Sequence, residues 1–369
     1  MKGHAEIAGA GFAGLTAAIG LRQHGWTVRV HESSPVLRAF GAGIFIWENG
    51  LRVLNALGAY EDVVNGSHIA PGYEGRNSDN QRISYEEFGL HRGTRMLTMT
   101  RQHLYKAMLG AADRVGVEVL AGSEVTGAAP EGKLLTSDGR SWKADLVIGT
   151  DGVRSRVRQS LGLEPRRTRF DFGVIRLLVP RGKNDLSGTD SDNVVNFWSQ
   201  NHRILYVPCN TGELYLAMGA RHEDKASTAI PVDRRIWSTA FPFLAHIIDR
   251  IGDEGRYDTY ETCRLPCWST GRVALVGDSA HAMPPTLGQG AGCAMMNALS
   301  LAVAVSKATD VEEGLRHWEA AERPLTDHVQ DISSSYAASR AGADGSSKWD
   351  AAAMRAALHI PTGAEKVAA

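Results

Sequence analysis

Hydrophobic and polar positions in the first 31 residues follow the order strand, helix, strand. Residues 5–8 form a short apolar run, residues 12–24 carry apolar side chains at helical spacing, and residues 27–31 have the pattern of a second strand. This order predicts a βαβ unit at the N-terminus, with a glycine-rich turn between its first strand and its helix.

Helical and strand patterns continue to alternate up to residue 148. We expect further helices and strands, with one polar, irregular stretch, in these places: helices at 49–57 and 101–114; strands at 117–120, 133–136 and 146–148; irregular chain at 66–94. The first half of the chain is therefore predicted to be α/β.

The middle of the chain has a different pattern. Four runs with strand character, at 173–179, 194–198, 203–207 and 213–218, predict successive antiparallel strands in a separate sheet. A short buried run at 273–276 follows, and the chain from residue 290 to about 342 is predicted to be helical.

This order predicts a discontinuous first domain that is interrupted by the second. The expected first domain comprises residues 1–70, 96–170 and 262–335. The second comprises residues 71–95 and 171–261, and residues 336–369 form a helical, alanine-rich tail. A chain of 369 residues is long enough for two such units and a large buried cofactor.

Composition narrows the class of partner. Charged residues make up 22% of the chain and the formal net charge is -1, which gives no electrostatic footprint for nucleic acid or acidic lipid. We therefore expect a small-molecule partner. The four cysteines form no Cys-x-x-Cys pair, and no signal peptide or membrane span is visible, so we expect a cytoplasmic protein.

The glycine-rich turn has the spacing of a dinucleotide-binding fingerprint. Gly9 permits a tight turn, Gly11 lets the backbone approach a pyrophosphate, and Gly14 lets the helix pack on the strand. Glu32, which ends the second strand, is placed to accept hydrogen bonds from ribose hydroxyls. A purely structural turn is the alternative, and the motif alone does not distinguish FAD from NAD.

Two later segments place a carboxylate at the end of a buried strand. Asp151-Gly152 ends one, and Gly277-Asp278 ends the other, shortly before a small-residue helix that begins near Gly290. Such a carboxylate can bind a ribityl hydroxyl, and the helix N-terminus can face an anionic flavin edge. An ordinary Asp-Gly turn and a helix-capping role for Asp278 are the alternatives.

These three segments, in this order, resemble the class A flavoprotein aromatic hydroxylases, the para-hydroxybenzoate hydroxylase-like family, over roughly residues 5–335. The resemblance implies a Rossmann-like FAD domain and an antiparallel-sheet substrate domain. It also implies FAD as cofactor, NADH or NADPH as co-substrate, and a flavin C4a-hydroperoxide as oxygen donor. The residues implied to contact the cofactor are Gly9, Gly11, Phe12, Ala13, Gly14, Glu32, Arg101, Asp151, Asp278, Pro285, Gly290, Ala291 and Gly292.

Further stretches, at 13–19, 37–43, 203–210 and 289–295, resemble family members that oxygenate and open a carboxylated 3-hydroxypyridine ring. That resemblance implies that Arg203, Tyr215 and Tyr73 bind the substrate. Simple ring hydroxylation remains open, and so does a nicotinamide-binding dehydrogenase. A redox-sensing binding module is a third alternative, and a homodimer is possible.

The strand pattern gives Arg203 and Tyr215 partial independent support. If 203–207 and 213–217 form a hairpin, both side chains project from one apolar face and should be near neighbours. A buried arginine is costly unless paired, and a substrate carboxylate held bidentately would pair it. The alternatives are a structural ion pair for Arg203 and mere packing for Tyr215 and for Tyr73, which we expect in a loop.

No other motif supplies the chemistry. His281 follows the third segment and is expected to be structural rather than a general base. No metal-ligand spacing and no Gly-x-Ser-x-Gly elbow is present, so oxygen activation is expected to rest on the flavin.

Overall fold

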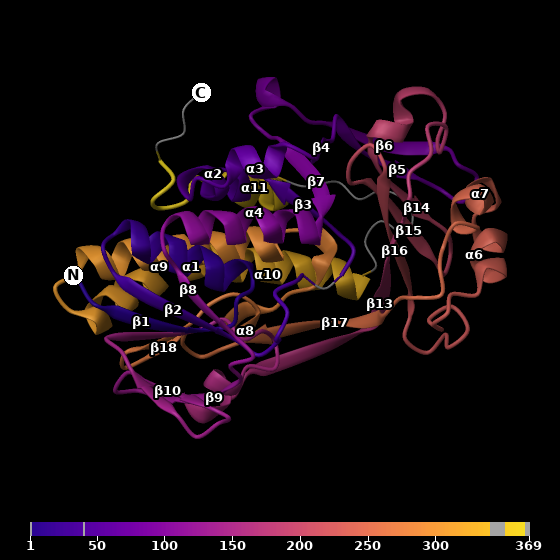
Figure 1. The fold of residues 1–369 in the computed structure, drawn as a ribbon. Helices are drawn as coiled ribbons and strands as arrows, with labels where there is room; N and C mark the ends of the chain where they lie inside the picture. The colour runs from indigo at the N-terminus through magenta and orange to yellow at the C-terminus, as the bar shows by residue number, and fades with distance from the viewer. Residues whose placement is uncertain (1, 40, 340–350, 366–369) are drawn as a thin grey trace.

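The computed structural model describes residues 2–39, 41–339 and 351–365. A helical and mixed-sheet part carries both termini, and a second sheet with its own short helices lies at the other end (Figure 1). The two longest helices, α9 (Gly290–Lys307) and α10 (Val311–Ser339), belong to the first part. The predicted α/β fold with an antiparallel excursion is confirmed.

A six-stranded sheet organises the first part. Its strand order is β18 (Ser269–Thr270), β19 (Val273–Leu275), β12 (Leu146–Gly149), β1 (His4–Ala8), β2 (Thr27–Glu32) and β8 (Glu118–Ala121). All neighbours run parallel except β18 and β19. Since the carboxyl ends of parallel strands meet at one edge, the turns after β1, β12 and β19 lie together there.

Helices cover this sheet. The most extensive contact is between α1 (Phe12–Gln23) and α9, where Gly20 lets the two backbones approach because a Cβ there would lie 3.0 Å from the Ala302 methyl group. The remaining helices of this part are α2 (Glu48–Ala56), α3 (Tyr60–Val64), α4 (Arg101–Arg114), α5 (Arg156–Ser160), α8 (Asp278–His281) and α11 (Ala351–Leu358). The helices predicted at 12–24, 49–57, 101–114 and 290–342 are confirmed wherever the structure describes them.

Two small sheets flank these elements. One has the order β3 (Gly43–Trp47), β7 (Met96–Thr100), β4 (His68–Ile69), and the other β11 (Ser141–Lys143), β10 (Lys133–Thr136), β9 (Val125–Ala129). The first of them carries Trp47, whose indole N–H donates to the Leu287 carbonyl at 3.1 Å. This contact ties β3 to the turn that precedes α9.

A seven-stranded sheet forms the second part. Its order is β17 (Tyr257–Arg264), β13 (Arg166–Pro180), β16 (Glu213–Arg221), β15 (Arg203–Pro208), β14 (Val194–Trp198), β5 (Gly72–Arg76) and β6 (Arg82–Glu87). The four antiparallel strands predicted for the middle of the chain are confirmed.

The expectation of an irregular stretch over 66–94 was wrong. This stretch contains β4, β5 and β6, followed by a short 3-10 turn, η1 (Leu90–Arg92). The sequence hides these strands because β5 is buried yet contains Glu74 and Arg76, while β6 is an edge strand with mostly exposed side chains. Neither strand shows the usual alternation of apolar and polar positions.

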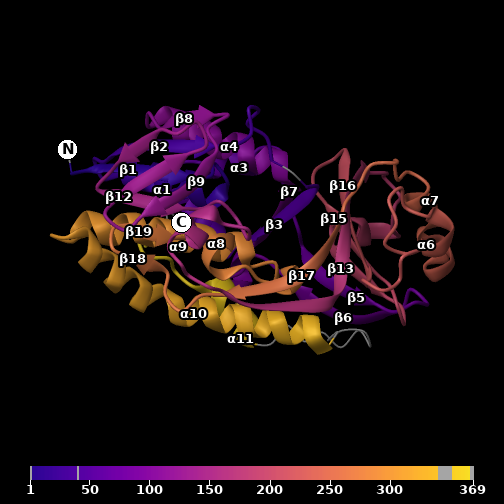
Figure 2. The same cartoon turned by 90° about the horizontal axis from the view of Figure 1, so that it is seen from below.

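The two faces of the seven-stranded sheet have different neighbours. The outer face packs against α6 (Arg234–Ala240), η3 (Pro242–Leu244) and α7 (Ala245–Ile248) through an apolar cluster that includes Phe197, Trp237 and Phe241. The inner face is turned toward β3 and the end of α10, in a cluster that contains Tyr73, Tyr215 and Tyr260. Seen from below, β13 and β17 run on from this sheet toward α8 (Figure 2).

The structure does not test one sequence-based expectation and describes another only in part. The domain boundaries stay a prediction. The expected C-terminal tail lies partly outside the described residues, and its described part contains the end of α10 and α11. No helix in the part of the chain that the structure describes is long and apolar enough to cross a membrane.

Candidate active site

The turn between β1 and α1 has the shape that its glycines predict. Gly9 has a φ of 99°, in the left-handed region that favours glycine, and a Cβ on Gly14 would collide with the Gly9 carbonyl. Gly11 differs, because a Cβ there would meet no atom within 4 Å. Gly9 and Gly14 are thus required by local packing, whereas Gly11 faces open space in which a pyrophosphate can approach.

The three predicted segments converge at this turn. A Cβ on Gly9 would lie 2.7 Å from the Thr150 carbonyl oxygen, which precedes Asp151. A Cβ on Gly277 would lie 3.3 Å from the Ala13 methyl group and 3.4 Å from that of Ala294 on α9. The first segment therefore contacts both the second and the third, as a single binding site requires.

Glu32 lies beside the glycine turn at the end of β2. Its carboxylate accepts hydrogen bonds from the backbone N–H of Ala10 at 3.0 Å and of Ser34 at 2.9 Å. These bonds fix the carboxylate at the edge of the turn, where ribose hydroxyls of a bound dinucleotide would arrive.

Asp151 has a structural role in addition to its predicted one. One carboxylate oxygen accepts from the backbone N–H of Arg156 at 2.7 Å and of Val157 at 3.1 Å, and so satisfies the start of α5. The other oxygen is buried and has no hydrogen-bond partner among the described residues. Direct contact of Asp151 with FAD stays a prediction, and this second oxygen is the atom able to make it.

Asp278 and Arg101 lie close enough for each to shift the pKa of the other. The Asp278 side chain is accessible to water although protein atoms surround it on most sides, and this confinement raises its pKa while Arg101 and Arg176 lower it. Burial lowers the pKa of Arg101, as does Arg176, whereas Asp278 raises it. The Arg101 guanidinium also lies 5.0 Å from the centre of the Phe12 ring, so the predicted residues of the first segment and of α4 meet here.

The remaining predicted cofactor residues form the entrance to α9. Pro285 begins the 3-10 turn η4 (Pro285–Leu287), and Gly290, Ala291 and Gly292 form the first turn of α9. The buried Gln289 side chain accepts a hydrogen bond from Asn49 at 3.0 Å, which holds this turn against α2. The N-terminal part of this 18-residue helix thus lies beside the Gly277-Asp278 turn, where a Cβ on Gly277 would lie 3.4 Å from the Ala294 methyl group.

These features fit FAD. The open space over Gly11 would accept its diphosphate, Glu32 its ribose, Asp278 its ribityl chain, and the α9 N-terminus the flavin edge that becomes negative on reduction. Sequence reasoning located all of these residues because each follows a strand or begins a helix in a recognisable motif.

The predicted substrate residues lie on the inner face of the seven-stranded sheet. Arg203 is opposite Gly219, and Tyr215 is opposite Val207, so both side chains share one face as expected. They are not adjacent, however, because four residues of strand, about 13 Å, separate the two pairs. The expectation of near neighbours was wrong because of the register of the hairpin. Arg203 lies far from the turn and pairs with Gly219, whereas Tyr215 lies close to the turn and pairs with Val207.

Tyr73 lies on strand β5 rather than in the predicted loop. β5 runs parallel to β14, with Tyr73 beside Val194, and places the tyrosine on the same inner face as Arg203. The Arg203 guanidinium lowers the pKa of Tyr73, although burial outweighs this effect and raises the pKa overall. Tyr73 and Arg203 therefore belong to one polar group in an otherwise apolar wall.

Arg203 is only 9% exposed, and its surroundings are neutral. Its Nε–H donates to the Asn196 side-chain oxygen at 2.7 Å, and its guanidinium lies 5.3 Å from the centre of the Trp198 ring. No Asp or Glu in the described part of the chain forms an ion pair with it. A buried cation without a counter-ion is costly, which indicates that an anion is supplied from outside the chain.

Three side chains that sequence reasoning missed complete this wall: Asn196, Trp198 and Tyr260. The indole N–H of Trp198 is buried without a hydrogen-bond partner among the residues that the structure describes, and Arg203 lies close enough to Tyr260 to lower the pKa of its hydroxyl against the effect of burial. Asn196 and Trp198 are two positions apart on β14 and so point to the same face, and the strand pattern could have predicted that they lie beside β15. Tyr260 could not be predicted in this way, because it reaches the wall from β17, at the far edge of the sheet.

The three tyrosines of the wall stay protonated at neutral pH. Burial raises the pKa of Tyr215 to about 12, and it also raises the pKa of Tyr73 and of Tyr260. Each hydroxyl is thus a hydrogen-bond donor rather than a base.

His281 is structural, in agreement with the expectation. Its ring is 2% exposed, its Nε2 accepts from the Gly277 backbone N–H at 3.2 Å, and burial lowers its pKa to about 4. A neutral ring whose nitrogen is already engaged by the turn is not free to take a proton from a substrate.

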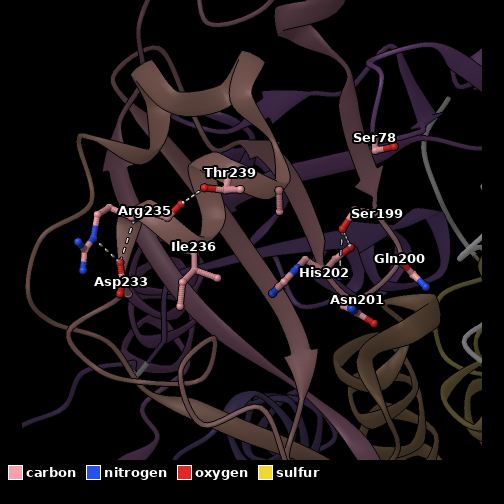
Figure 3. A pocket seen from close by; sticks show the side chains of 10 residues that line it. Ser78, Ser199, Gln200, Asn201, His202, Asp233, Arg235, Ile236 and Thr239 are labelled. Carbon is pink, nitrogen blue, oxygen red and sulfur yellow. Dashed lines mark hydrogen bonds and ion pairs between the residues drawn. The ribbon is translucent and has the colours of Figure 1, made fainter.

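A cavity of about 740 Å³ lies on the other side of the seven-stranded sheet. It is open, and its lining comes from the tip of the β14–β15 hairpin, the N-terminal end and exposed side of α6, and Ser78 (Figure 3). Because α6 packs on the outer face, this cavity is separated by the sheet from Arg203 and from the cofactor residues.

Comparison with known proteins gives a consistent result. The sequence model of a family described as "FAD binding domain" matches residues 4–333. A Rhodococcus erythropolis protein, named as a putative 2-heptyl-3-hydroxy-4(1H)-quinolone synthase, is 40% identical over 98% of both chains. A 6-hydroxynicotinate 3-monooxygenase of Pseudomonas fluorescens is 29% identical and covers 80% of both chains.

Among solved structures, the tetrameric form of 2-methyl-3-hydroxypyridine-5-carboxylic acid oxygenase superposes with a TM-score of 0.91 at 46% identity. The match covers 96% of this chain and 95% of that one. Relatives named for a pyridine carboxylate and relatives named as quinolone synthases therefore both align with most of the length of this chain, at 29% to 46% identity.

Proposed function

The chain belongs to the FAD-binding family of aromatic-ring monooxygenases, and on that premise we propose that it oxygenates a 3-hydroxypyridine ring that bears a carboxylate, and opens the ring. Members of this family use FAD as the cofactor and usually a reduced nicotinamide dinucleotide as the co-substrate. The substrate and the ring opening are the proposal.

One observation carries the choice of substrate. Arg203 is buried in the inner wall, and its only described partners are neutral: Asn196, Trp198 and the nearby tyrosines. A carboxylate is the ligand that pairs a guanidinium bidentately and offsets its desolvation. A quinolone with an alkyl chain offers no such anion, so Arg203 supports the carboxylated ring over the quinolone.

Each residue of the wall has a role in this reaction. FAD, when bound, would pass two electrons from the reduced nicotinamide to O2 and so would activate the oxygen atom that is transferred to the ring. Arg203 holds the carboxylate, which fixes the ring in the plane of the wall. Tyr215 and Tyr73 are protonated donors that orient the ring nitrogen and the ring hydroxyl, and the surrounding apolar side chains exclude water from the oxygenated carbon.

Product mass tests the proposal. Purified enzyme with FAD and NADH is given 5-hydroxynicotinate, 2-methyl-3-hydroxypyridine-5-carboxylate or the unhydroxylated 2-heptyl-4(1H)-quinolone, and flavin reduction is followed by absorbance. We expect the two acids to accelerate reduction and to yield products heavier by O2 and two hydrogens. A product heavier by one oxygen atom would indicate simple hydroxylation, and a preference for the quinolone would reject Arg203 as the determinant of specificity.

The assembly is a separate part of the proposal. The pyridine oxygenase structure is described as tetrameric, so we propose that this chain also forms a homo-oligomer, and a tetramer rather than the dimer considered from the sequence. Light scattering on the holoenzyme distinguishes a dimer from a tetramer.

A further inference from the structure

A polar pair lies inside the six-stranded sheet, where apolar side chains are usual. Parallel strands that are covered on both faces normally carry near-continuous apolar runs. Glu6 interrupts β1 and His31 interrupts β2, and each residue is only 1% exposed. The His31 Nε2 lies 2.7 Å from a carboxylate oxygen of Glu6. Neither side chain is among the residues predicted to contact the cofactor, so the pair needs another explanation.

Glu6 has several partners within the chain. Its second carboxylate oxygen lies 2.9 Å from the His4 Nε2 and accepts from Arg29 at 3.0 Å. Arg29 is opposite Glu6 in the β1–β2 pair and also donates to Glu118 on β8 at 3.0 Å. Replacement of a buried charged group by apolar residues often leaves stability unchanged or raises it. The group therefore indicates a need for a fixed position rather than for stability.

His31 connects this pair to the flavin site in two ways. Its carbonyl accepts from the Gly9 N–H of the glycine turn at 2.7 Å. Its Nδ1 lies 2.8 Å from the Ser123 hydroxyl, and the Ser123 N–H donates to the Glu32 carbonyl at 2.8 Å. The His31 side chain is thus held between Glu6 and the residue that fixes the backbone of Glu32, the predicted ribose ligand.

The position of the Glu32 carboxylate depends on where β2 ends relative to the glycine turn. The carboxylate bonds the N–H of Ala10, which directly follows Gly9. A displacement of His31 would therefore move both Gly9 and Glu32. Because good hydrogen bonds keep donor and acceptor within about 2.7–3.2 Å, a small shift of this strand end is enough to weaken bonds between Glu32 and a ribose.

The small sheet β11–β10–β9 covers the pair. The Trp142 ring of β11 lies 5.3 Å from the His31 ring, measured between ring centres, and the Arg29 guanidinium lies 4.5 Å from the centre of the Trp142 ring. Polar contacts are stronger in such a shielded place than in water. The contact between Glu6 and His31 is therefore well suited to hold the end of β2.

We propose that Glu6 and His31 are positioning residues for the adenosine half of FAD. Their buried pair holds Glu32 and the Gly9 turn in the arrangement that binds the ribose, although neither side chain touches the cofactor. The proposal concerns the cofactor alone and does not depend on the identity of the ring substrate.

His4 provides a matched control on the same carboxylate. It contacts the other oxygen of Glu6, and its Nδ1 lies 2.9 Å from the Thr27 hydroxyl. His4 and Thr27 begin β1 and β2, at the end of the sheet opposite to the glycine turn. Substitution of His4 removes one imidazole from Glu6 and leaves the connection through His31 intact.

The test compares the binding of FAD and of an analogue whose adenosine lacks both ribose hydroxyl groups. Each is titrated into the apoprotein, and flavin fluorescence is followed. Wild type should bind FAD at least about tenfold more tightly than the analogue, since a hydrogen bond to a charged acceptor is worth roughly a factor of ten. His31→Leu should raise the Kd of FAD about tenfold and that of the analogue less than about twofold. His4→Leu should change either Kd less than about twofold, and His31→Gln, whose amide can donate to Glu6, should regain part of the discrimination.

Three outcomes would overturn the proposal. A wild type that binds both ligands equally would remove Glu32 as the ribose ligand. Equal weakening of both ligands in His31→Leu would mean that the pair only supports the fold, and an equal effect of His4→Leu would remove the special role of His31. If His31→Leu does not fold, Glu6→Gln gives the same comparison and should lower the discrimination at least about threefold.

Discussion

Two buried polar groups in this molecule have opposite relations to the protein around them. Arg203 lies in the inner wall of the seven-stranded sheet, where its partners are neutral. His281 lies behind the Gly277-Asp278 turn, and its Nε2 accepts hydrogen bonds from the Gly277 N–H and the Asn297 side chain. The Asn297 side chain also donates to the Thr326 hydroxyl at 3.0 Å.

This difference distinguishes a residue that stabilises the fold from a residue that binds a ligand. The network at the His281 Nε2 is made by residues of the chain itself and joins α8, α9 and α10, so it contributes to stability. Arg203 has no carboxylate partner among the described residues, and the Trp198 N–H beside it also has no hydrogen-bond partner among them. Incomplete polar groups that gather on one wall mark the place of a ligand.

Substitution of Arg203 should have the largest effect on catalysis. We expect Arg203→Met to lower kcat/KM for the carboxylated substrate by about thirty- to five-thousandfold, because loss of a buried charge partner costs about 2–5 kcal/mol. The unfolding free energy should stay the same or rise, since a costly buried cation is removed.

Arg250→Met serves as the control for Arg203. Arg250 already has a carboxylate partner in the chain, Asp185 at 2.6 Å. Its loss should lower stability and leave kcat/KM unchanged. Equal losses of activity in the two variants would contradict the distinction between the two kinds of arginine.

Substitution of His281 should change stability with pH and leave the chemistry intact. Its folded-state pKa of about 4 lies below the ordinary 6.5, so the unfolded chain binds more protons between these values. The wild-type unfolding free energy should therefore fall as pH falls from about 6.5 to 4, by up to about 3 kcal/mol, and His281→Gln should lose this dependence. Denaturant titrations at pH 7.5 and 5 measure it, and an unchanged slope in the variant would show that other groups dominate.

Tyr215→Phe should have a smaller effect on the reaction. Loss of one neutral donor lowers kcat/KM about tenfold. Since the pKa of Tyr215 is about 12, the pH profile of kcat/KM should have no limb from this residue between pH 6 and 9 in either protein. A limb that appears only in the wild type would mean that the hydroxyl acts as a base.

Tyr206 on the outer face should give the smallest effect. Its hydroxyl donates to the Ser191 carbonyl at 3.2 Å, away from the inner wall. Tyr206→Phe should cost about 1 kcal/mol of stability or less, with no change in kcat/KM. A loss of activity comparable to that of Tyr215→Phe would contradict the assignment of the substrate site to the inner face of the sheet alone.

The sequence predicted the cofactor side of the site better than the substrate side. The cofactor residues follow strands or begin helices, and local glycine and aspartate motifs reveal such positions. The substrate wall is built from strands distant in sequence, and its geometry depends on register, which placed Tyr215 farther from Arg203 than expected. Tyr260 escaped notice because nothing local in 257–264 indicates which strand lies beside it.

The most direct test of the central claim is a comparison of two ligands that differ in one charge. The Kd values of 5-hydroxynicotinate and of its neutral carboxamide are measured for the wild-type holoenzyme and for Arg203→Met. We predict that the wild type binds the acid at least about thirtyfold more tightly than the amide, and that the variant binds both equally. A wild type that binds the amide as tightly as the acid would contradict the assignment of Arg203 as the carboxylate anchor.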